Sequence, residues 1–413
     1  LLIPQDVPAS LHLIKKAITL KTLSEEQLNF SVRKILKAKY WMGLQNYEPV
    51  VLENLREDLN TVSDVLLHRK LVKSSITVLK DVQQNIPLAN LENKKIAYVK
   101  LGDDSGDDFV NMLKNYTKIE VVSDENLDGL MKKLKPFTDV IIGFHKSNNH
   151  PWKSYKFAEK ELVWLQEIAR QKRVILDVFT SPYSLLQLKI FKNIEGLIVS
   201  YQNSKLAQEL SAQLIFGVFE ANGKLPVSIG DKFKEGHGLK TYKLSRFEYS
   251  VPEDVNLSSK KLARIDQFAD TILKEKMAPG FQVLVARKGK IVFNKSYGYH
   301  TEKKTREVRN SDIYDLASLT KILASLPLIM KAEEDAKIPL SASLKDLLPS
   351  FSNSNKDTVS VKEILSHAAK LKAWIPFYIS TQDSVTHKNL PIFYRKQKSN
   401  RFSVKVAEDL YMR

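Results

Sequence analysis

Between about residues 75 and 215, short apolar runs alternate regularly with amphipathic stretches. The apolar runs predict buried strands and are SITVLK, KIAYVKL, IEVVS, DVIIGF, RVILDVF and EGLIVSY. The stretches between them predict helices and are FVNMLKNY, ENLDGLMKKLK, EKELVWLQEIARQ, SPYSLLQLKIF and SKLAQELSAQLIFG. Continuous apolar strands that alternate with helices are typical of a mostly parallel sheet covered on both faces. The sequence therefore predicts an α/β fold, with an α/β/α sandwich in this part of the chain.

Composition narrows the possible classes of protein. The chain has 413 residues, 43% of them hydrophobic and 27% charged, which suits a globular protein of two or three domains. It has no apolar run long enough to span a membrane and no cysteine, which excludes disulfides and thiolate metal sites. The net charge of +17 is spread along the chain. We interpret it as a solvated lysine-rich surface, with binding to acidic polymers or an anionic envelope surface as the alternative. No basic module with interleaved aromatic residues predicts nucleic-acid binding.

The two ends of the sequence predict different structures. LLIPQDVP reads as the end of a strand and a loop, and two helices follow in PASLHLIKKAITL and SEEQLNFSVRKILKAKYWMGL. Ser24 suits the start of the second helix and Gly43 its end, and a further helix is expected over Val62–Lys73. The sequence closes on VAEDLYMR, which reads as part of a helix. Because both ends look cut, we expect the chain to be an internal segment of a larger polypeptide.

Some polar residues of the sheet region invite interpretation as a site. Four acidic residues follow one predicted strand, and they are Asp103, Asp104, Asp107 and Asp108. Because no nearby glutamate or histidine completes a cage, a solvated turn is favoured over a metal site. His145 and His150 flank a loop at a strand's C-terminal end, where α/β sheets usually bind ligands, yet a structural role is favoured for both. No glycine-rich nucleotide motif is present, so no cofactor is predicted.

The C-terminal third predicts a helix, a hairpin and then a second helix. Ser258 or Ser259 can cap an amphipathic helix that ends before Pro279. GFQVLVARKGKIVFNKSYGYHT predicts two strands joined by a turn that contains Gly289. IYDLASLTK then opens an apolar helix.

Ser318 and Lys321 are the candidate catalytic residues. Their i, i+3 spacing places both side chains on one helical face, about 5–6 Å apart at Cβ. A partly neutral amine can accept the serine proton, and a helix N-terminus favours a developing oxyanion. The bland alternative is a serine at a helix start with its lysine in solvent.

Two family resemblances add to this interpretation. Gly223-Lys224-Leu225-Pro226-Val227 resembles the closing segment of the second domain of glycoside hydrolase family 3, and about residues 1–240 resemble its β-N-acetylglucosaminidase-like members. In that family the catalytic aspartate and Asp-His pair belong to the barrel, whose motifs are absent here, so no glycosidase residue is assigned to this chain. The segment SVRKILKAKYWMGL resembles the last turns of that family's barrel.

The order of helix, hairpin and S-x-x-K resembles the serine β-lactamase and penicillin-binding-protein family, especially its esterase-like relatives. The resemblance implies that Ser318 is the acylating nucleophile, Lys321 its activating partner and the Ser318 N–H part of an oxyanion hole. The family's L-x-H-x-x-G-L segment matches at Leu365 and His367, but Lys370 stands where the glycine is usual. We interpret His367 as structural. The family's Tyr-x-Asn or Ser-x-Asn and Lys-Thr-Gly or His-x-Gly elements are not found after Lys321 and are expected beyond Arg413.

Together these features predict a domain organisation. Its parts are the last helices of a family 3 barrel (1–48), the α/β sandwich (49–240), a linker (241–258) and the N-terminal part of a β-lactamase-like α+β domain (259–413). The expected parent is a periplasmic or secreted hydrolase of the bacterial cell envelope that acts on carbohydrate or peptidoglycan-derived substrates and on small esters or amides. The segment alone is expected to be inactive. The alternative is a non-catalytic carbohydrate-binding scaffold with a degenerate serine hydrolase domain.

Overall fold

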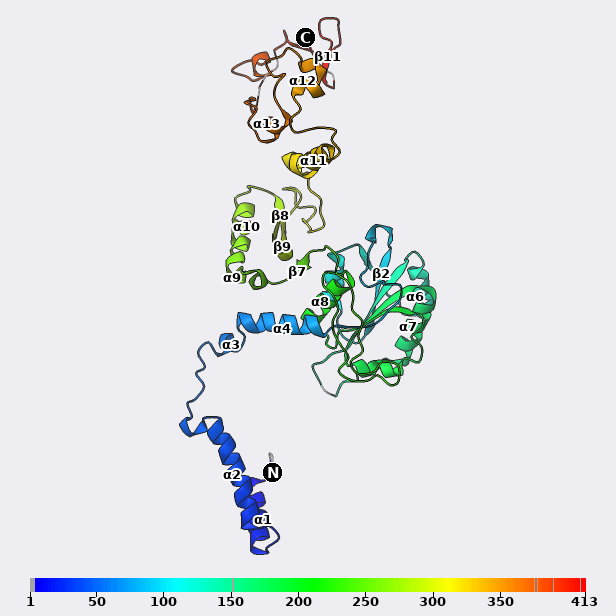
Figure 1. The fold of residues 1–413 in the computed structure, drawn as a ribbon, viewed down its shortest axis with the longest axis vertical. Helices are drawn as coiled ribbons and strands as arrows, with labels where there is room; N and C mark the ends of the chain where they lie inside the picture. Colours follow the sequence, from blue (N-terminus) through cyan, green and yellow to red (C-terminus); the bar gives the residue numbers. More distant parts are fainter. Residues whose placement is uncertain (1–3, 151, 375, 377, 389, 409) are drawn as a thin grey trace. The chain divides into compact units, whose positions relative to one another are not determined.

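The structure is a computed structural model, and it describes residues 4–150, 152–374, 376, 378–388, 390–408 and 410–413. The chain divides into two compact units, residues 1–310 and 311–413, which are described separately (Figure 1). The opening strand expected in LLIPQDVP falls largely on residues 1–3, outside the described residues. None of the described helices is long and apolar enough to cross a membrane.

A six-stranded sheet forms the centre of the first unit, in the order β1-β6-β5-β4-β2-β3. All six predicted strands are present, and β2 to β6 pair in parallel, whereas β1 pairs antiparallel with β6. The strands are β1 (Thr77–Asp81), β2 (Ile96–Gly102), β3 (Ile119–Val121), β4 (Asp139–His145), β5 (Arg173–Phe179) and β6 (Ile194–Val199). The predicted mostly parallel α/β sheet is therefore confirmed.

Helices cover both faces of this sheet, and each face has its own apolar core (Figure 1). One core packs α6 (Leu127–Leu134) and α7 (Glu159–Gln171) against the sheet. The other packs α5 (Asp107–Lys114) and α8 (Lys205–Ile215) against the opposite face. One helix prediction is wrong in type: SPYSLLQLKIF forms only a short 3₁₀ segment, η3 (Pro182–Gln187). Pro182 lies at its start, and Leu185 and Leu188 are buried there without continuing a helix.

The predicted N-terminal helices are present as α1 (Val7–Thr19), α2 (Glu25–Trp41) and α4 (Val62–Ser75). A 3₁₀ turn, η1 (Leu44–Asn46), and a short helix, α3 (Leu55–Asp58), lie between α2 and α4 and were not predicted. Ser24 Oγ accepts a hydrogen bond from the Gln27 N–H at 3.1 Å, which caps α2. Gly43 follows α2 with φ +74°, a left-handed conformation that suits glycine. None of the residues in α1 and α2 is buried.

The predicted hairpin belongs to a small sheet of order β7-β9-β8. Its elements are β7 (Glu248–Tyr249), η4 (Pro252–Val255), α9 (Ser259–Leu262), α10 (Arg264–Lys274), β8 (Gly280–Arg287) and β9 (Lys290–Gly298). Lys288 and Gly289 form the turn, and both have positive φ, as a type I′ hairpin requires. Ser258 Oγ caps α9 by accepting from the Lys261 N–H at 3.2 Å.

The segment predicted as a linker is built into this fold. Arg246 donates from Nη1 to the carbonyl oxygens of Leu88 and Phe216, at 2.9 and 2.8 Å, and Glu248 starts a strand that pairs with β9. Proline and mixed polar residues in a sequence therefore do not imply a free connector here. The division into units falls after Asn310 rather than at the predicted linker, and the predicted domain boundaries stay predictions.

The second unit contains short elements. They are η5 (Ala317–Leu319), η6 (Lys321–Ser325), α11 (Leu326–Glu334), α12 (Leu344–Leu347), η7 (Pro349–Phe351), α13 (Val361–Leu365), η8 (Ile379–Thr381), β10 (Tyr394–Arg395), β11 (Val404–Ala407) and β12 (Leu410–Met412). The strands form an antiparallel sheet of order β10-β12-β11. The helix expected in VAEDLYMR is therefore wrong, because this stretch closes a β-hairpin. Val404 and Val406 are β-branched and alternate with Lys405, a pattern that favours extended backbone.

Candidate active site

The structure brings Ser318 and Lys321 together. Ser318 Oγ accepts a hydrogen bond from Lys321 Nζ at 3.0 Å, so the i, i+3 spacing does place both side chains on one face. This is the contact that a serine nucleophile and an activating amine require. Their catalytic roles stay a prediction.

The backbone around this pair is not a regular α-helix. Ser318 lies in the 3₁₀ turn η5, Lys321 begins the π-helical segment η6, and α-helical geometry starts only at Leu326. Pro327 lies in the first turn of α11, and it has no N–H to donate to the preceding turn, which accounts for the change of helix type. Short π-helical segments often occur at functional sites.

Ala317, directly before the serine, has an unusual conformation. Its φ is +43°, in the left-handed region that residues with a Cβ rarely adopt, and its N–H donates to Asp315 Oδ1 at 2.7 Å. Left-handed non-glycine residues store strain and concentrate at functional sites. The strained residue therefore directly precedes Ser318, at the start of this helical segment.

Both side chains of the pair are exposed among the described residues of the second unit. The sequence interpretation required a buried amine, because burial would keep the lysine partly neutral. These residues do not bury the Lys321 amine. The large apolar side chains nearby, such as Leu319 (53% exposed) and Ile322 (57%), are also open to solvent.

The downstream histidine segment forms a capped helix and a tight turn. Ser360 and Glu363 form a capping box at the start of α13. His367 and Lys370 follow the helix with φ of +58° and +52°. Lys370 therefore adopts the left-handed conformation for which the family uses glycine, so the turn forms despite the substitution. His367 is exposed.

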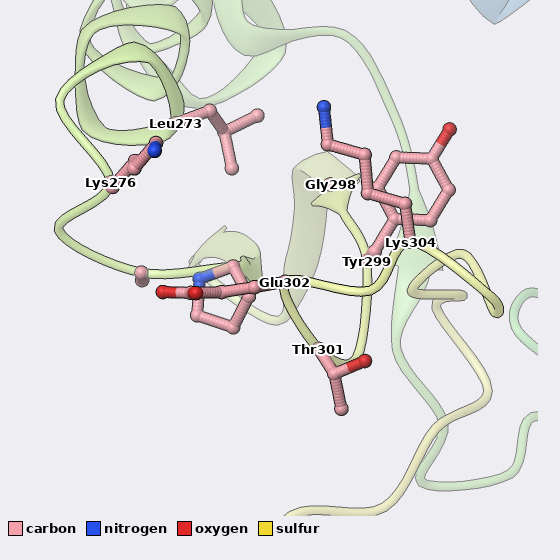
Figure 2. Close-up of a pocket in the computed structure, with 9 residues that line it drawn as sticks. Leu273, Lys276, Gly298, Tyr299, Thr301, Glu302 and Lys304 are labelled. Carbon is pink, nitrogen blue, oxygen red and sulfur yellow. The ribbon is translucent and has the colours of Figure 1, made fainter.

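A separate pocket of about 370 Å³ lies between the end of α10 and the loop after β9. Figure 2 shows Leu273 and Lys276 on the helix side, and Gly298, Thr301 and Glu302 on the loop side. Its lining includes the hydroxyls of Tyr299 and Thr301, a carboxylate and two lysines, but no serine–lysine pair.

A buried polar network occupies the C-terminal edge of the large sheet. His145 is fully buried and stacks on Phe179 with ring centroids 4.5 Å apart. Its Nδ1 lies 2.7 Å from Asn203 Oδ1, and its Nε2 lies 2.9 Å from the Tyr98 hydroxyl. Because an amide oxygen only accepts, Nδ1 donates and Nε2 accepts from the phenol. Burial lowers the pKa of His145 to about 4, so the ring is neutral near pH 7.

The acidic loop is tied into the same network. Asn203 donates from Nδ2 to Asp104 Oδ2 at 2.9 Å, and this hydrogen bond lowers the pKa of the Asp104 carboxyl. No cluster of possible metal ligands occurs among the described residues. The structural interpretation of His145 agrees with these contacts, and His150 is an exposed loop residue.

The sequence interpretation missed Asp177, a fully buried acid in the middle of β5. Its carboxyl accepts from Ser200 Oγ at 2.8 Å and from Ser211 Oγ. Burial raises the pKa of Asp177 to about 7 despite these two donors. A single acidic residue within the otherwise apolar run RVILDVF was the signal that could have revealed it.

Comparison with known proteins identifies the class of the C-terminal part. Residues 265–401 match the protein-family model described as Beta-lactamase. The C-terminal part of the chain therefore contains a beta-lactamase-family domain, as the order of helix, hairpin and S-x-x-K predicted. This domain follows an α/β domain with a mostly parallel sheet.

Two curated relatives match this same part. Protein flp of Staphylococcus aureus (strain MRSA252) is 29% identical over 136 residues, which are 32% of this chain and 26% of that protein. Esterase EstB of Burkholderia gladioli is 28% identical over 116 residues, which are 27% of this chain and 30% of the esterase. The matches thus span about a quarter to a third of the relatives' lengths.

Solved structures similar to the N-terminal half include glycoside hydrolase family 3 enzymes. A family 3 β-N-acetylglucosaminidase from Paenibacillus sp. str. FPU-7 has a TM-score of 0.39 and 15% identity over 52% of this chain and 41% of that chain. A β-glucosidase from Listeria innocua has a TM-score of 0.43 and 20% identity over 52% of this chain and 34% of that chain. At such TM-scores the likeness carries no argument about activity.

Proposed function

We propose that this chain is part of a bacterial cell-envelope hydrolase that acts on esters or amides through Ser318. The observation that carries the proposal is the 3.0 Å contact between Lys321 Nζ and Ser318 Oγ, within the residues that match the beta-lactamase family. The proposal includes that this hydrolase is exported, either to the periplasm or out of the cell.

The proposed reaction is acyl transfer to serine followed by hydrolysis. Ser318 Oγ attacks the acyl carbonyl while its proton passes to the uncharged Lys321 amine, and Lys321 then gives this proton to the leaving alcohol or amine as its bond to the acyl carbon breaks. Water then cleaves the acyl-serine ester and regenerates the hydroxyl. Because Lys321 is exposed, the step requires that substrate or further protein surface desolvate the amine.

We further propose that the N-terminal part derives from a β-N-acetylglucosaminidase of glycoside hydrolase family 3. The Gly223–Val227 run supports this origin, and no glycosidase catalytic residue is assigned to the chain. Carbohydrate or peptidoglycan-derived substrates are the corresponding substrate class for the parent protein.

The alternative is a non-catalytic carbohydrate-binding scaffold with a degenerate serine domain. One observation favours it: Lys370 occupies a left-handed position at which glycine costs least. A serine domain no longer selected for turnover would tolerate such a residue.

The experiment is hydrolysis of p-nitrophenyl esters and of a chromogenic cephalosporin by the longest natural polypeptide that contains this chain. Ser318→Ala should abolish turnover, and Lys321→Ala should lower kcat about 100-fold or more with the thermal unfolding midpoint unchanged. Ser325→Ala, a change of another exposed serine on the same segment, is the matched control and should keep full activity. Equal rates for Ser318→Ala and wild type would refute the nucleophile assignment, and no hydrolysis by wild type would favour the scaffold.

A further inference from the structure

Asp315 lies three residues before Ser318 and was not among the residues that the sequence singled out. Its Oδ1 accepts a hydrogen bond from the Ala317 N–H at 2.7 Å. A carboxylate that accepts from the N–H two residues further on forms a tight local turn, because the short aspartate side chain takes the place of a backbone carbonyl. A side chain therefore bends the segment that leads into the serine.

This hydrogen bond acts on an unfavourable backbone conformation. Ala317 is the one residue between 311 and 325 with a positive φ, at +43°, where its Cβ approaches the backbone too closely for comfort outside glycine, asparagine and aspartate. On its other side, the Ala317 carbonyl oxygen accepts from the Thr320 N–H, within the turn η5. Ala317 is thus held at both of its peptide groups, by Asp315 before it and by the 3₁₀ turn after it.

The conformation of Ala317 sets the orientation of the candidate catalytic pair. Rotation about its N–Cα bond would turn Ser318 relative to the chain before it. The contact between Lys321 Nζ and Ser318 Oγ lies entirely on the C-terminal side of that bond, so the pair would move as one body. The Ser318 N–H, the expected oxyanion donor, lies in the peptide that follows Ala317 and would turn with the pair. The φ of Ala317 therefore controls where the pair points, without changing the distance within it.

The charge of Asp315 does not explain its place before the pair. A negative charge near Lys321 would favour the charged amine, which cannot accept the serine proton. Accepting the Ala317 N–H requires only an oxygen in the same position, and an asparagine side chain also offers one. The contribution that the geometry identifies is therefore the hydrogen bond.

We propose that Asp315 is a positioning residue for the reaction of Ser318. Its carboxylate holds Ala317 in the left-handed conformation and so fixes the direction in which Ser318 and Lys321 meet the acyl group. The inference rests on the proposed function of Ser318, and Asp315 itself touches neither Ser318 Oγ nor Lys321 Nζ through a hydrogen bond. Because a displacement of about 1 Å at a reacting group can cost about 100-fold in rate, loss of this contact should lower kcat.

The test removes the carboxylate and keeps or replaces the hydrogen bond. Hydrolysis of p-nitrophenyl esters is measured in the longest natural polypeptide that contains this chain. Asp315→Ala should lower kcat at least about tenfold, with KM changed less than about twofold. Asp315→Asn should keep kcat within about threefold of wild type, because its amide oxygen accepts the same hydrogen bond.

Glycine at position 317 supplies the second arm of the test. Glycine adopts a left-handed φ without the cost that a Cβ imposes, so it needs no help from a side chain. In the Ala317→Gly protein, Asp315→Ala should therefore lower kcat less than about threefold. Asp335→Ala removes the same charge from an exposed aspartate at the end of α11, and as the matched control it should keep the wild-type kcat.

Hydrogen–deuterium exchange of residues 317–325 measures the same local order without requiring activity. Asp315→Ala should speed exchange of these amides at least about threefold, and Asp315→Asn should not. In the Ala317→Gly protein, Asp315→Ala should leave exchange unchanged.

Three outcomes would overturn the inference. The first is wild-type kcat and wild-type exchange in Asp315→Ala. The second is an equal loss of kcat in Asp315→Asn and Asp315→Ala, which would assign the effect to charge. The third is an undiminished effect of Asp315→Ala in the glycine background. A wild type that hydrolyses no ester would refute the proposed function of Ser318, and exchange would still decide whether Asp315 holds Ala317.

Discussion

Replacing Asp177 with asparagine should change how the stability of the sheet domain depends on pH. The carboxyl is fully buried, and burial raises its pKa in the folded chain from 3.8 to about 7. Between these two values the folded chain keeps a proton that the unfolded chain has lost. Stability from this group is therefore fully present below pH 3.8 and is lost as the pH rises through about 7. The full loss corresponds to about 4 kcal/mol.

His145 contributes with the opposite sign in the same pH range. Burial lowers its pKa from 6.5 to about 4, so the unfolded chain binds a proton that the folded chain does not. Its contribution is present above pH 6.5 and is lost as the pH falls through about 4, by about 3 kcal/mol. In the wild type the two buried groups should largely cancel between about pH 4 and 6.5. In Asp177→Asn the pH dependence of stability that comes from His145 should therefore become visible.

The difference between Asp177→Asn and wild type isolates the carboxyl, because every other group titrates in both proteins. Hydrogen–deuterium exchange of the β4 and β5 amides measures the stability of the sheet domain locally. Variant and wild type are compared at the same pH. From pH 5 to pH 7 the variant should gain about 2 kcal/mol over wild type, which is about a 30-fold rise in relative protection. Ser200→Ala keeps the carboxyl and serves as the control, which should not show this gain. A difference independent of pH would refute the assignment of a buried, proton-holding Asp177.

Two further substitutions test a strained backbone conformation and a partly buried ion pair. Lys370→Gly should stabilise the second unit by about 0.5–1 kcal/mol, because relief of the left-handed φ outweighs the entropy cost of glycine. Thermal unfolding measures this gain. Lys372→Gly, at another exposed lysine, is the control and should destabilise the unit. Glu248→Ala should lower the free energy of unfolding by about 3 kcal/mol, because Glu248 pairs with Lys73 at 3.0 Å and faces buried Arg69 at 3.9 Å. Glu248→Gln should lower it less. Similar urea midpoints for Glu248→Ala and wild type would contradict this reasoning.

The sheet was predictable because its strands are continuous apolar runs, which few other structures accommodate. KIAYVKL and DVIIGF form β2 and β4 as expected, and the Lys288-Gly289 turn forms as expected between β8 and β9. Capping also followed from sequence, because the Ser24 contact is local. Features fixed by residues close in the sequence were therefore recovered.

Features fixed by distant residues were not recovered. SPYSLLQLKIF has helix-forming residues, but packing against the sheet holds it as η3. Asp177 meets Ser200 and Ser211 only after β6 and α8 have packed beside β5. For the candidate site, spacing predicted the contact between Ser318 and Lys321, whereas the π-helical segment and the strained Ala317 depend on Pro327 and on tertiary context.

The two edges of the sheet differ in what they leave available to a ligand. The C-terminal edge is where α/β sheets usually bind ligands, yet both imidazole nitrogens of His145 already have protein partners there. A ligand on His145 would have to break the bond to Tyr98 or Asn203 and leave a buried group unpaired, at about 1–3 kcal/mol. Lys135 and Lys192 at the opposite edge require no such exchange, because their ammonium groups are exposed and line open depressions. At His145 the C-terminal edge is thus closed to a ligand, whereas the lysines of the opposite edge are open to solvent.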